Sequence, residues 1–295
     1  MTLRIGVLGL GRMGAPVARR LGERFPTTGF DLDPARVVEG LPLAADAAEL
    51  AAGSDVLVTV LPGPGEVRTA LVDDGALAAL RPGALWLDLS SNDPRVADEL
   101  ATRAATRGVT SAAAPMSGGP AEAAGGRLGF FLGRPDADAA RVRAVLDPLG
   151  TPIDPVAGTT PGAAHLAKLL ANGLWFGQAL AVTEALLLGR AGGLDPEALR
   201  AILARSAGGS VFLDRYADAL LAGDPMADFG LDRVVEELDT LEALATDAGV
   251  AHDILARVAA LHRDALAAYG PVDGELLGSR LLLDRSGVAD LRAPD

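Results

Sequence analysis

Hydrophobic and polar positions follow two alternating patterns in the first half of the chain. Short runs rich in Val, Leu and Ile, typical of buried strands, are separated by stretches with helical spacing. This alternation predicts a parallel, doubly wound sheet with ligands at the carboxyl ends of its strands. We expect strands at residues 3–8, 27–30, 55–61, 84–90, 109–115, 128–132 and 152–156, and helices at 16–21, 66–71, 95–107 and 138–149.

The second half has helical spacing throughout. Residues 161–193 are dominated by Ala and Leu with no proline after the first position, which predicts one long helix. Apolar side chains occupy nearly every side of it, so we expect neighbouring helices and a second subunit to cover it. Polar residues interrupt it too often for a membrane span. Further helices are expected at 195–205, 211–221, 232–248, 252–268 and 276–283.

A glycine turn follows the first predicted strand and leads into a helix. In this context the spacing G-x-G-x-x-G predicts a site for a dinucleotide pyrophosphate. Gly9 permits the tight turn, Gly11 lets the backbone approach the phosphates, and Gly14 lets the helix pack on the strand. The predicted cofactor ligands here are Gly9, Leu10, Gly11, Arg12, Met13 and Gly14. We therefore predict a Rossmann-type dinucleotide-binding domain at 1–160, followed by an all-α substrate and oligomerisation domain at 161–295.

Asp31 closes the second predicted strand, where a carboxylate accepts the hydroxyls of the adenosine ribose. An acid there repels a 2′-phosphate, which favours NAD over NADP. Arg12 and Arg36 can each pair with a phosphate, so NADP stays open as the alternative. Asp33 precedes a proline and is expected to cap a helix.

Three more loops leave the predicted carboxyl ends of strands. Residues 61–65 and 90–94 are the first two. The alternative interpretation of the second loop is a simple capping turn, with Asp93 as the helix cap. The third loop is residues 115–120. Its glycines beside Ser117 can form a concave group of amide donors that suits a carboxylate, or simply a flexible turn. The predicted cofactor contacts in these loops are Leu61, Pro62 and Ser91, and the predicted substrate contacts are Ser91, Ser117, Gly118 and Gly119.

Lys168 is the only lysine among the 26 Lys and Arg residues. Arg keeps its proton in proteins, whereas burial disfavours the charged form of Lys and suits it to general acid/base work near neutral pH. Asn172 lies one turn further on and shares its helix face. We predict that these two residues are catalytic. The alternative is that codon bias left one lysine whose amine extends to solvent.

Charge and cysteine content exclude several classes of function. The net charge of -13 argues against nucleic-acid binding. The absence of cysteine excludes disulfides, thiolate catalysis and cysteine-bound zinc, and no metal site is expected. The first residues lack the charged lead and cleavage site of a signal segment. We expect a cytoplasmic protein that binds a small molecule and no membrane, and that assembles as a homodimer or homotetramer through its helical domain.

Taken together, these motifs resemble the β-hydroxyacid dehydrogenase family, which contains 3-hydroxyisobutyrate dehydrogenase and, more distantly, 6-phosphogluconate dehydrogenase. The resemblance covers nearly the whole chain and rests on residues 9–14, 87–91, 114–119 with Gly125, and 162–172. It implies hydride transfer between a nicotinamide cofactor and a small 3-hydroxy acid or its semialdehyde. It also implies that Lys168 is the general acid/base, that Asn172 helps to place the substrate, and that residues 117–119 hold its carboxylate, with Ser91 near the nicotinamide.

Several positions depart from the family pattern. Ala171 and Trp175 replace the His and Glu of 6-phosphogluconate dehydrogenase, so decarboxylation of a sugar phosphate is not expected. Glu236-Glu237 falls where the hydroxyisobutyrate branch has Lys-Asp, which exchanges a cation for an acid. His165 is expected to be a packing or cap residue rather than a second acid/base. An imine or sulfonate-aldehyde reductase, or a nucleotide-binding module without catalysis, are the alternative functions.

Overall fold

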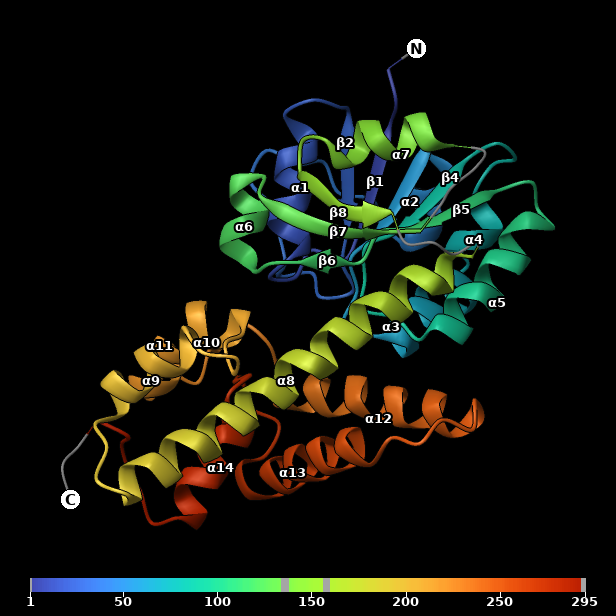
Figure 1. The fold of residues 1–295 in the computed structure, drawn as a ribbon. Coiled ribbons are helices and arrows are strands. Elements are labelled where there is room, and N and C mark those ends of the chain that lie inside the picture. The colour runs from blue at the N-terminus through green and yellow to red at the C-terminus, as the bar shows by residue number, and fades with distance from the viewer. Residues whose placement is uncertain (1, 134–137, 156–159, 293–295) are drawn as a thin grey trace. The chain divides into compact units, whose positions relative to one another are not determined.

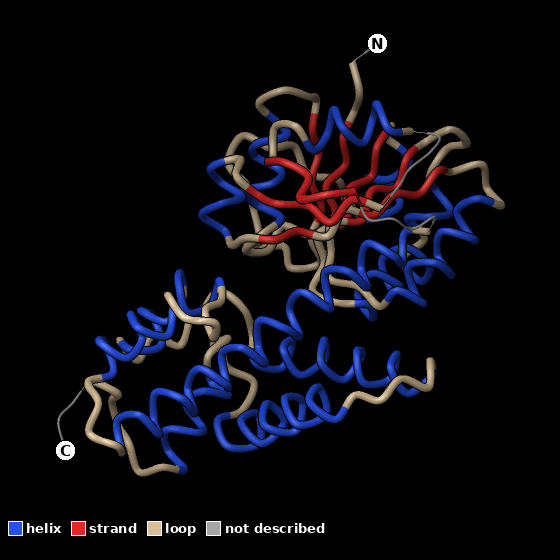
Figure 2. Tube along the Cα trace, viewed as in Figure 1, coloured by secondary structure: helices blue, strands red, loops and turns tan. Residues whose placement is uncertain are grey.

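A computed structural model describes residues 2–133, 138–155 and 160–292 (Figure 1). The chain divides into two compact units, Met1–Lys168 and Leu169–Asp295. Helix α8 (Pro161–Ala191) begins in the first unit and continues into the second, as the single long helix predicted from the sequence. The named strands all lie in the first unit, as the red segments of Figure 2 show. The domain boundary expected before residue 161 stays a prediction.

The first unit is built on a parallel sheet with the strand order β2-β1-β3-β4-β5. The order reverses between β1 and β3, and in such sheets the carboxyl ends of these strands border the ligand crevice. The Rossmann-type doubly wound fold expected from the sequence is therefore confirmed. The strands are β1 (Ile5–Leu8), β2 (Thr27–Phe30), β3 (Val56–Thr59), β4 (Leu85–Asp88) and β5 (Thr110–Ala113).

Two apolar cores cover the two faces of this sheet. One contains Val7, Val17 and Phe130, and the other contains Leu57 and Trp86. Strands buried on both faces explain the unbroken apolar runs in the sequence. The helical segments of this unit are α1 (Gly14–Gly22), α2 (Ala47–Ala52), α3 (Pro64–Arg68), the π-helical turn η1 (Thr69–Asp73), α4 (Ala76–Ala79), α5 (Pro94–Ala105), α6 (Pro120–Gly125) and α7 (Ala139–Leu146).

The later strands form a second sheet instead of extending the first. This sheet has the order β6-β7-β8, with β6 (Met116–Ser117) antiparallel to β7 (Leu128–Leu132) and β8 (Gly150–Pro155) parallel to β7. The chain leaves β5 at Ala113 and passes Pro115, whose carbonyl accepts the amide of Phe131. Proline has no amide to continue a ladder, which favours a change of sheet there. The expected last strand residue, Val156, lies outside the described residues.

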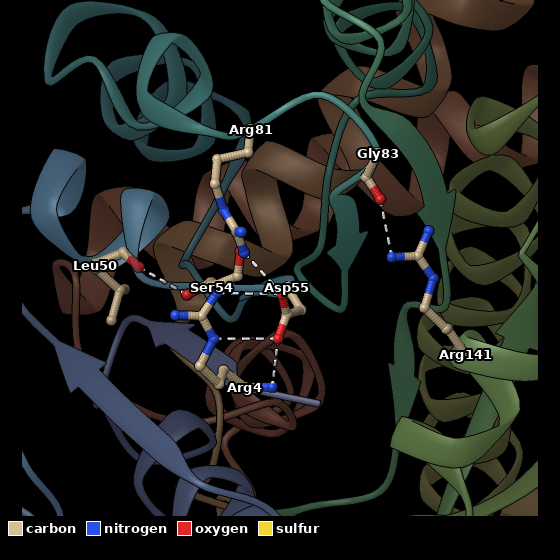
Figure 3. Close-up of polar contacts among 7 residues, drawn as sticks. All are labelled: Arg4, Leu50, Ser54, Asp55, Arg81, Gly83 and Arg141. Atoms are coloured by element: carbon tan, nitrogen blue, oxygen red, sulfur yellow. Dashed lines mark hydrogen bonds and ion pairs between the residues drawn. The ribbon is translucent and has the colours of Figure 1, made fainter. Parts of the chain in front are cut away.

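An ion-pair cluster closes the amino edge of the parallel sheet, opposite the ligand edge. Asp55 accepts hydrogen bonds from the backbone amide of Arg4 at 2.9 Å and from Arg81 at 2.7 Å (Figure 3). The side-chain hydrogen bond from Arg4 lowers the pKa of Asp55 far below its usual value. Nearby, Arg141 of α7 donates to the carbonyl of Gly83 at 3.0 Å. The contacts at this edge therefore stabilise the fold.

The second unit is helical. A core cluster that includes Phe176, Leu180, Val234 and Leu261 joins α8 to α12 and α13. The helix expected at 211–221 is interrupted at Tyr216, where φ is −119°. Within the described residues, no helix is long and apolar enough to cross a membrane. The remaining helices are α9 (Pro196–Ala204), α10 (Val211–Arg215), α11 (Ala217–Leu221), α12 (Leu231–Asp247), α13 (Asp253–Tyr269) and α14 (Leu277–Arg285).

Candidate active site

A buried carboxylate organises the loop at the carboxyl end of β4. Asp88 ends this strand, and its Oδ1 accepts hydrogen bonds from Thr59 Oγ1 at 2.8 Å and from the amide of Ser90 at 3.0 Å. Its Oδ2 accepts one from Asn92 Nδ2 at 2.9 Å. Thr59 ends β3, so Asp88 joins two neighbouring strand ends and fixes the loop of residues 89–92.

Asp88 is ionised in this setting. Burial raises the pKa of its carboxyl group, but contact with His165 and hydrogen bonds from Asn92 and Ser90 outweigh burial and lower the pKa below its ordinary value. His165 Nε2 lies 3.4 Å from Asp88 Oδ2, and both side chains are almost fully buried. Among the described residues, no group makes a hydrogen bond of good geometry to either ring nitrogen. The contact is therefore an electrostatic one.

Lys168 is 5% exposed, and its Nζ donates a hydrogen bond to Ser91 Oγ at 2.6 Å. Asp98 of α5 holds the start of α8, which packs closely against α5. The amide of Gly162 donates to Asp98 Oδ1 at 2.7 Å, and a Cβ at residue 162 would lie 2.5 Å from the carbonyl oxygen of Pro94. The structure thus brings together two of the residues predicted from the sequence, and the amine does not point to bulk solvent.

Asn172 belongs to the second unit and contacts an acid of α12. Its Nδ2 donates to Glu237 Oε2 at 2.7 Å, and Glu237 is 6% exposed. Glu236 is only half-buried and pairs with Arg233 at 2.8 Å. Of the two acids at the altered family positions, Glu237 is therefore the one that orients a predicted catalytic side chain. The sequence singled out Glu236, which stands where the family has Lys, and gave no sign that Glu237 would contact Asn172.

The glycine turn after β1 has the geometry expected of a phosphate-binding turn. Gly9 has a φ of +98°, and a Cβ there would lie 2.3 Å from the carbonyl oxygen of Val60. A Cβ at Gly14, the first residue of α1, would lie 1.9 Å from the carbonyl oxygen of Gly9. Only glycine fits at either position. These residues fit the pyrophosphate of a dinucleotide at the start of α1.

Asp31 follows β2 and lies against this turn. Its Oδ2 accepts the amide of Leu10 at 2.7 Å, and Arg36 Nη1 lies 3.6 Å from the same oxygen. A Cβ at Gly11 would lie 2.8 Å from Arg36 Nη1, so this guanidinium borders the turn together with the carboxylate. Both an acid for ribose hydroxyls and a cation for a phosphate are present.

The expectation that Asp33 caps a helix is wrong. Its Oδ1 accepts the amide of Ala35 at 3.0 Å, but the chain makes only a turn there. The following segment runs beside β2, where the amide of Gly29 donates to the carbonyl of Pro42 at 2.9 Å. Backbone pairing along β2 thus takes the place of a helix. Asp93, by contrast, caps α5 as expected by accepting the amide of Arg95 at 2.8 Å.

The two other predicted loops follow β3 and β6. The amide of Leu61 donates to Ser90 Oγ at 3.0 Å, which ties the loop after β3 to the loop after β4, and Pro62 is exposed. Ser117 ends β6, and Gly118 has a φ of +115°. The amide of Gly119 donates a hydrogen bond to Glu122 Oε2 at 3.0 Å, and Gly119 is the N-cap residue of α6. No group of three or more potential metal ligands occurs within the described ranges.

A parallel sheet with a glycine turn at its first crossover defines a dinucleotide-binding protein. Residues 4–162 match the family model described as the NAD binding domain of 6-phosphogluconate dehydrogenase. Residues 162–276 match the model described as NAD-binding of NADP-dependent 3-hydroxyisobutyrate dehydrogenase.

Known proteins of this kind resemble the chain over most of its length. It is 33% identical over 255 residues to 2-(hydroxymethyl)glutarate dehydrogenase of Eubacterium barkeri, with 84% of this chain and 83% of that protein covered. It is 37% identical over 221 residues to 3-hydroxyisobutyrate dehydrogenase of Pseudomonas aeruginosa, with 72% of each covered. The solved structure of Mycobacterium tuberculosis 3-hydroxyisobutyrate dehydrogenase with L-serine superposes with a TM-score of 0.86 at 27% identity, covering 95% of this chain and 99% of that one.

The chain belongs to the β-hydroxyacid dehydrogenase family. It is an NAD(P)-dependent oxidoreductase that acts on the CH–OH group of its substrate.

Proposed function

We propose that the protein interconverts a small 3-hydroxy acid and its semialdehyde, with Lys168 as the general acid/base. The observation that carries this proposal is the buried amine of Lys168, hydrogen-bonded to Ser91 Oγ at 2.6 Å beyond the carboxyl end of β4. Two relatives are named for 3-hydroxyisobutyrate and 2-(hydroxymethyl)glutarate. Both compounds carry a hydroxymethyl group on the carbon next to a carboxylate, and this defines the substrate class.

In the proposed oxidation, the neutral amine of Lys168 accepts the proton of the substrate hydroxyl while the C–O bond becomes a carbonyl. A bound nicotinamide supplies the hydride acceptor. In the reverse direction the ammonium of Lys168 returns the proton to the carbonyl oxygen. Ser91 Oγ accepts a hydrogen bond from Nζ. The role proposed for this bond is to keep the amine directed at the reacting oxygen. Asn172, one turn later in α8, is assigned to substrate placement.

The substrate carboxylate is assigned to the residues after β6. Because Glu122 already accepts the amide of Gly119, the donors proposed for the carboxylate are the hydroxyl of Ser117 and the amide of Gly118. Gly119, which was expected from the sequence to bind the carboxylate as well, is left out of this proposal. The preferred cofactor is proposed to be NAD. Asp31 follows β2 beside the glycine turn, which is where an acid accepts ribose hydroxyls in folds of this class, and its charge would oppose a 2′-phosphate.

The test is an assay of small 3-hydroxy acids with NAD, and of their semialdehydes with NADH. Replacing Lys168 with Ala should lower kcat by roughly 10²–10⁴-fold, the usual contribution of a general acid/base, while NAD affinity stays the same. Lys168→Arg should be similarly slow, because it keeps the cation but cannot release a proton. A Lys168→Ala variant with most of its activity would refute the mechanism. A wild-type protein that binds NAD and converts none of these substrates would refute the proposed substrate class.

A further inference from the structure

His165 lies one helical turn before Lys168, with its side chain wholly buried. Nε2 is 3.4 Å from Asp88 Oδ2, and neither ring nitrogen has a hydrogen-bond partner in the described part of the chain. Burying a polar ring without a full hydrogen bond is unfavourable, and such groups in native structures call for a functional explanation. Packing alone would be served better by Leu at this position.

Asp88 connects His165 to the loop that carries Ser91. The same carboxylate binds the amide of Ser90 and the side chain of Asn92, the two neighbours of Ser91. Ser91 in turn accepts the hydrogen bond of Lys168. The helix and the loop are therefore joined twice, by His165 with Asp88 and by Lys168 with Ser91.

We propose that Asp88 and His165 form a positioning pair that fixes α8 against the loop after β4 and so sets the distance and direction between Lys168 and Ser91. This inference rests on the proposed function, in which Lys168 transfers the proton. The attraction between the buried carboxylate and the imidazole edge acts one turn behind the amine. Neither residue is assigned a contact with substrate or cofactor, so their effect is on the rate of the chemical step.

The test compares His165→Leu with His165→Gln. Leucine removes the polar edge, whereas the amide nitrogen of Gln reaches about as far as Nε2 and can donate to Asp88. We expect His165→Leu to lower kcat roughly ten- to hundredfold, in line with the cost of a small displacement of a catalytic group. KM should stay within about twofold, and His165→Gln should recover kcat to within about threefold of wild type. Leu166→Ala, on the adjacent exposed position of α8, is the matched control and should leave kcat unchanged.

Two results would overturn this proposal. One is a His165→Leu variant with wild-type kcat. The other is a His165→Gln variant as slow as His165→Leu when both unfold at the wild-type temperature, since a packing role would explain that outcome. If His165→Leu does not fold, His165→Asn replaces it, because its shorter amide does not reach Asp88 and should remain slow. Lys168→Ala is measured in parallel. Normal turnover by that variant refutes the proposed function itself, whereas a slow Lys168→Ala beside a fast His165→Leu refutes only the positioning pair.

Discussion

Lys168 is an amine withdrawn from solvent, and the hydroxyl of Ser91 accepts one of its hydrogen bonds. A buried ammonium is costly without partners, so this bond helps to keep the amine inside the protein while it is charged. A hydroxyl is a suitable partner because it accepts from the ammonium and donates to the neutral amine. Both protonation states needed for acid/base work are thus accommodated by one side chain.

Removing that hydroxyl should slow the reaction without abolishing it. A hydrogen bond to a charged group contributes about 1.5–3 kcal/mol, so Ser91→Ala should lower kcat roughly ten- to hundredfold. Steady-state kinetics at saturating substrate and cofactor measure this directly. Ser91→Thr retains a hydroxyl and serves as the control, with an expected kcat close to wild type. Equal rates for the Ala and Thr variants would show that the hydroxyl does not assist Lys168.

At the scale of elements, the first turn of α8 determines where Lys168 lies. Gly162 allows this turn to approach α5 closely enough for its amide to reach Asp98 Oδ1 at 2.7 Å. Thr160 adds a second hydrogen bond, from Oγ1 to Asp98 Oδ2 at 3.0 Å. Helix α5, which follows the loop of residues 89–92, therefore also anchors α8, the helix that carries Lys168. A shift of this anchor would move Nζ relative to Ser91.

Gly162→Ala should produce such a shift. The added Cβ would meet the carbonyl oxygen of Pro94 at 2.5 Å and Asp98 Oδ2 at 2.7 Å, so backbone must move. Overpacking of this kind costs about 1–3 kcal/mol of stability, and we expect a lower melting temperature together with a lower kcat. Gly177→Ala in the same helix is the control. Its Cβ would lie 3.5 Å from Val258, an ordinary contact, so Ala should stabilise the protein by about 0.5–1 kcal/mol. A Gly162→Ala variant as stable and active as wild type would contradict the claim that the contact of Gly162 with α5 positions Lys168.

Several elements were predictable because each carries its own signal. A mainly apolar run identified β7 to the residue, and helix formers without an internal proline identified α8. The strand expected at residues 27–30, just before Asp31, also matches β2 to the residue. Short elements such as α2 (Ala47–Ala52) and β6 (Met116–Ser117) were missed because they are shorter than the windows in which a period is visible. The break of the helix at Tyr216 was missed because apolar spacing continues across it.

The site was predictable as a set of candidates and not as a set of contacts. Lys168 stood out by composition and Ser91 by its place after a strand, but their hydrogen bond depends on where α8 lies against β4. The contact between His165 and Asp88 had no signal, because a single His in an apolar helix does not indicate its partner. The hydrogen bond from Gly119 to Glu122 had one sequence signal, a Glu three residues after the cap position, which is a known capping pattern.

At the scale of the whole molecule, the two units have separate cores and separate parts of the proposed task. The glycine turn, Asp31 and Leu61 all lie within the first unit, whereas Asn172 and Glu237 lie in the second. A dinucleotide held by the first unit should therefore stabilise that unit in particular. Binding to the folded state alone raises the free energy of unfolding by about 2.7 kcal/mol at a hundred times the dissociation constant. Cofactor choice can thus be read from thermal stability, independently of catalysis.

We expect NAD to raise the melting temperature more than NADP at equal concentration, because the carboxylate of Asp31 opposes a 2′-phosphate. Arg36 lies 3.6 Å from that carboxylate and is the cation available to an NADP phosphate, so Arg36→Ala should remove most of the residual NADP effect and leave the NAD effect nearly intact. Asp31→Asn keeps acceptor oxygen for the amide of Leu10 while removing the charge, and it should narrow the difference between the cofactors. Differential scanning fluorimetry of the three proteins with each cofactor makes the measurement. Stronger stabilisation of the wild type by NADP would show that Arg36, and not Asp31, decides the specificity of the turn.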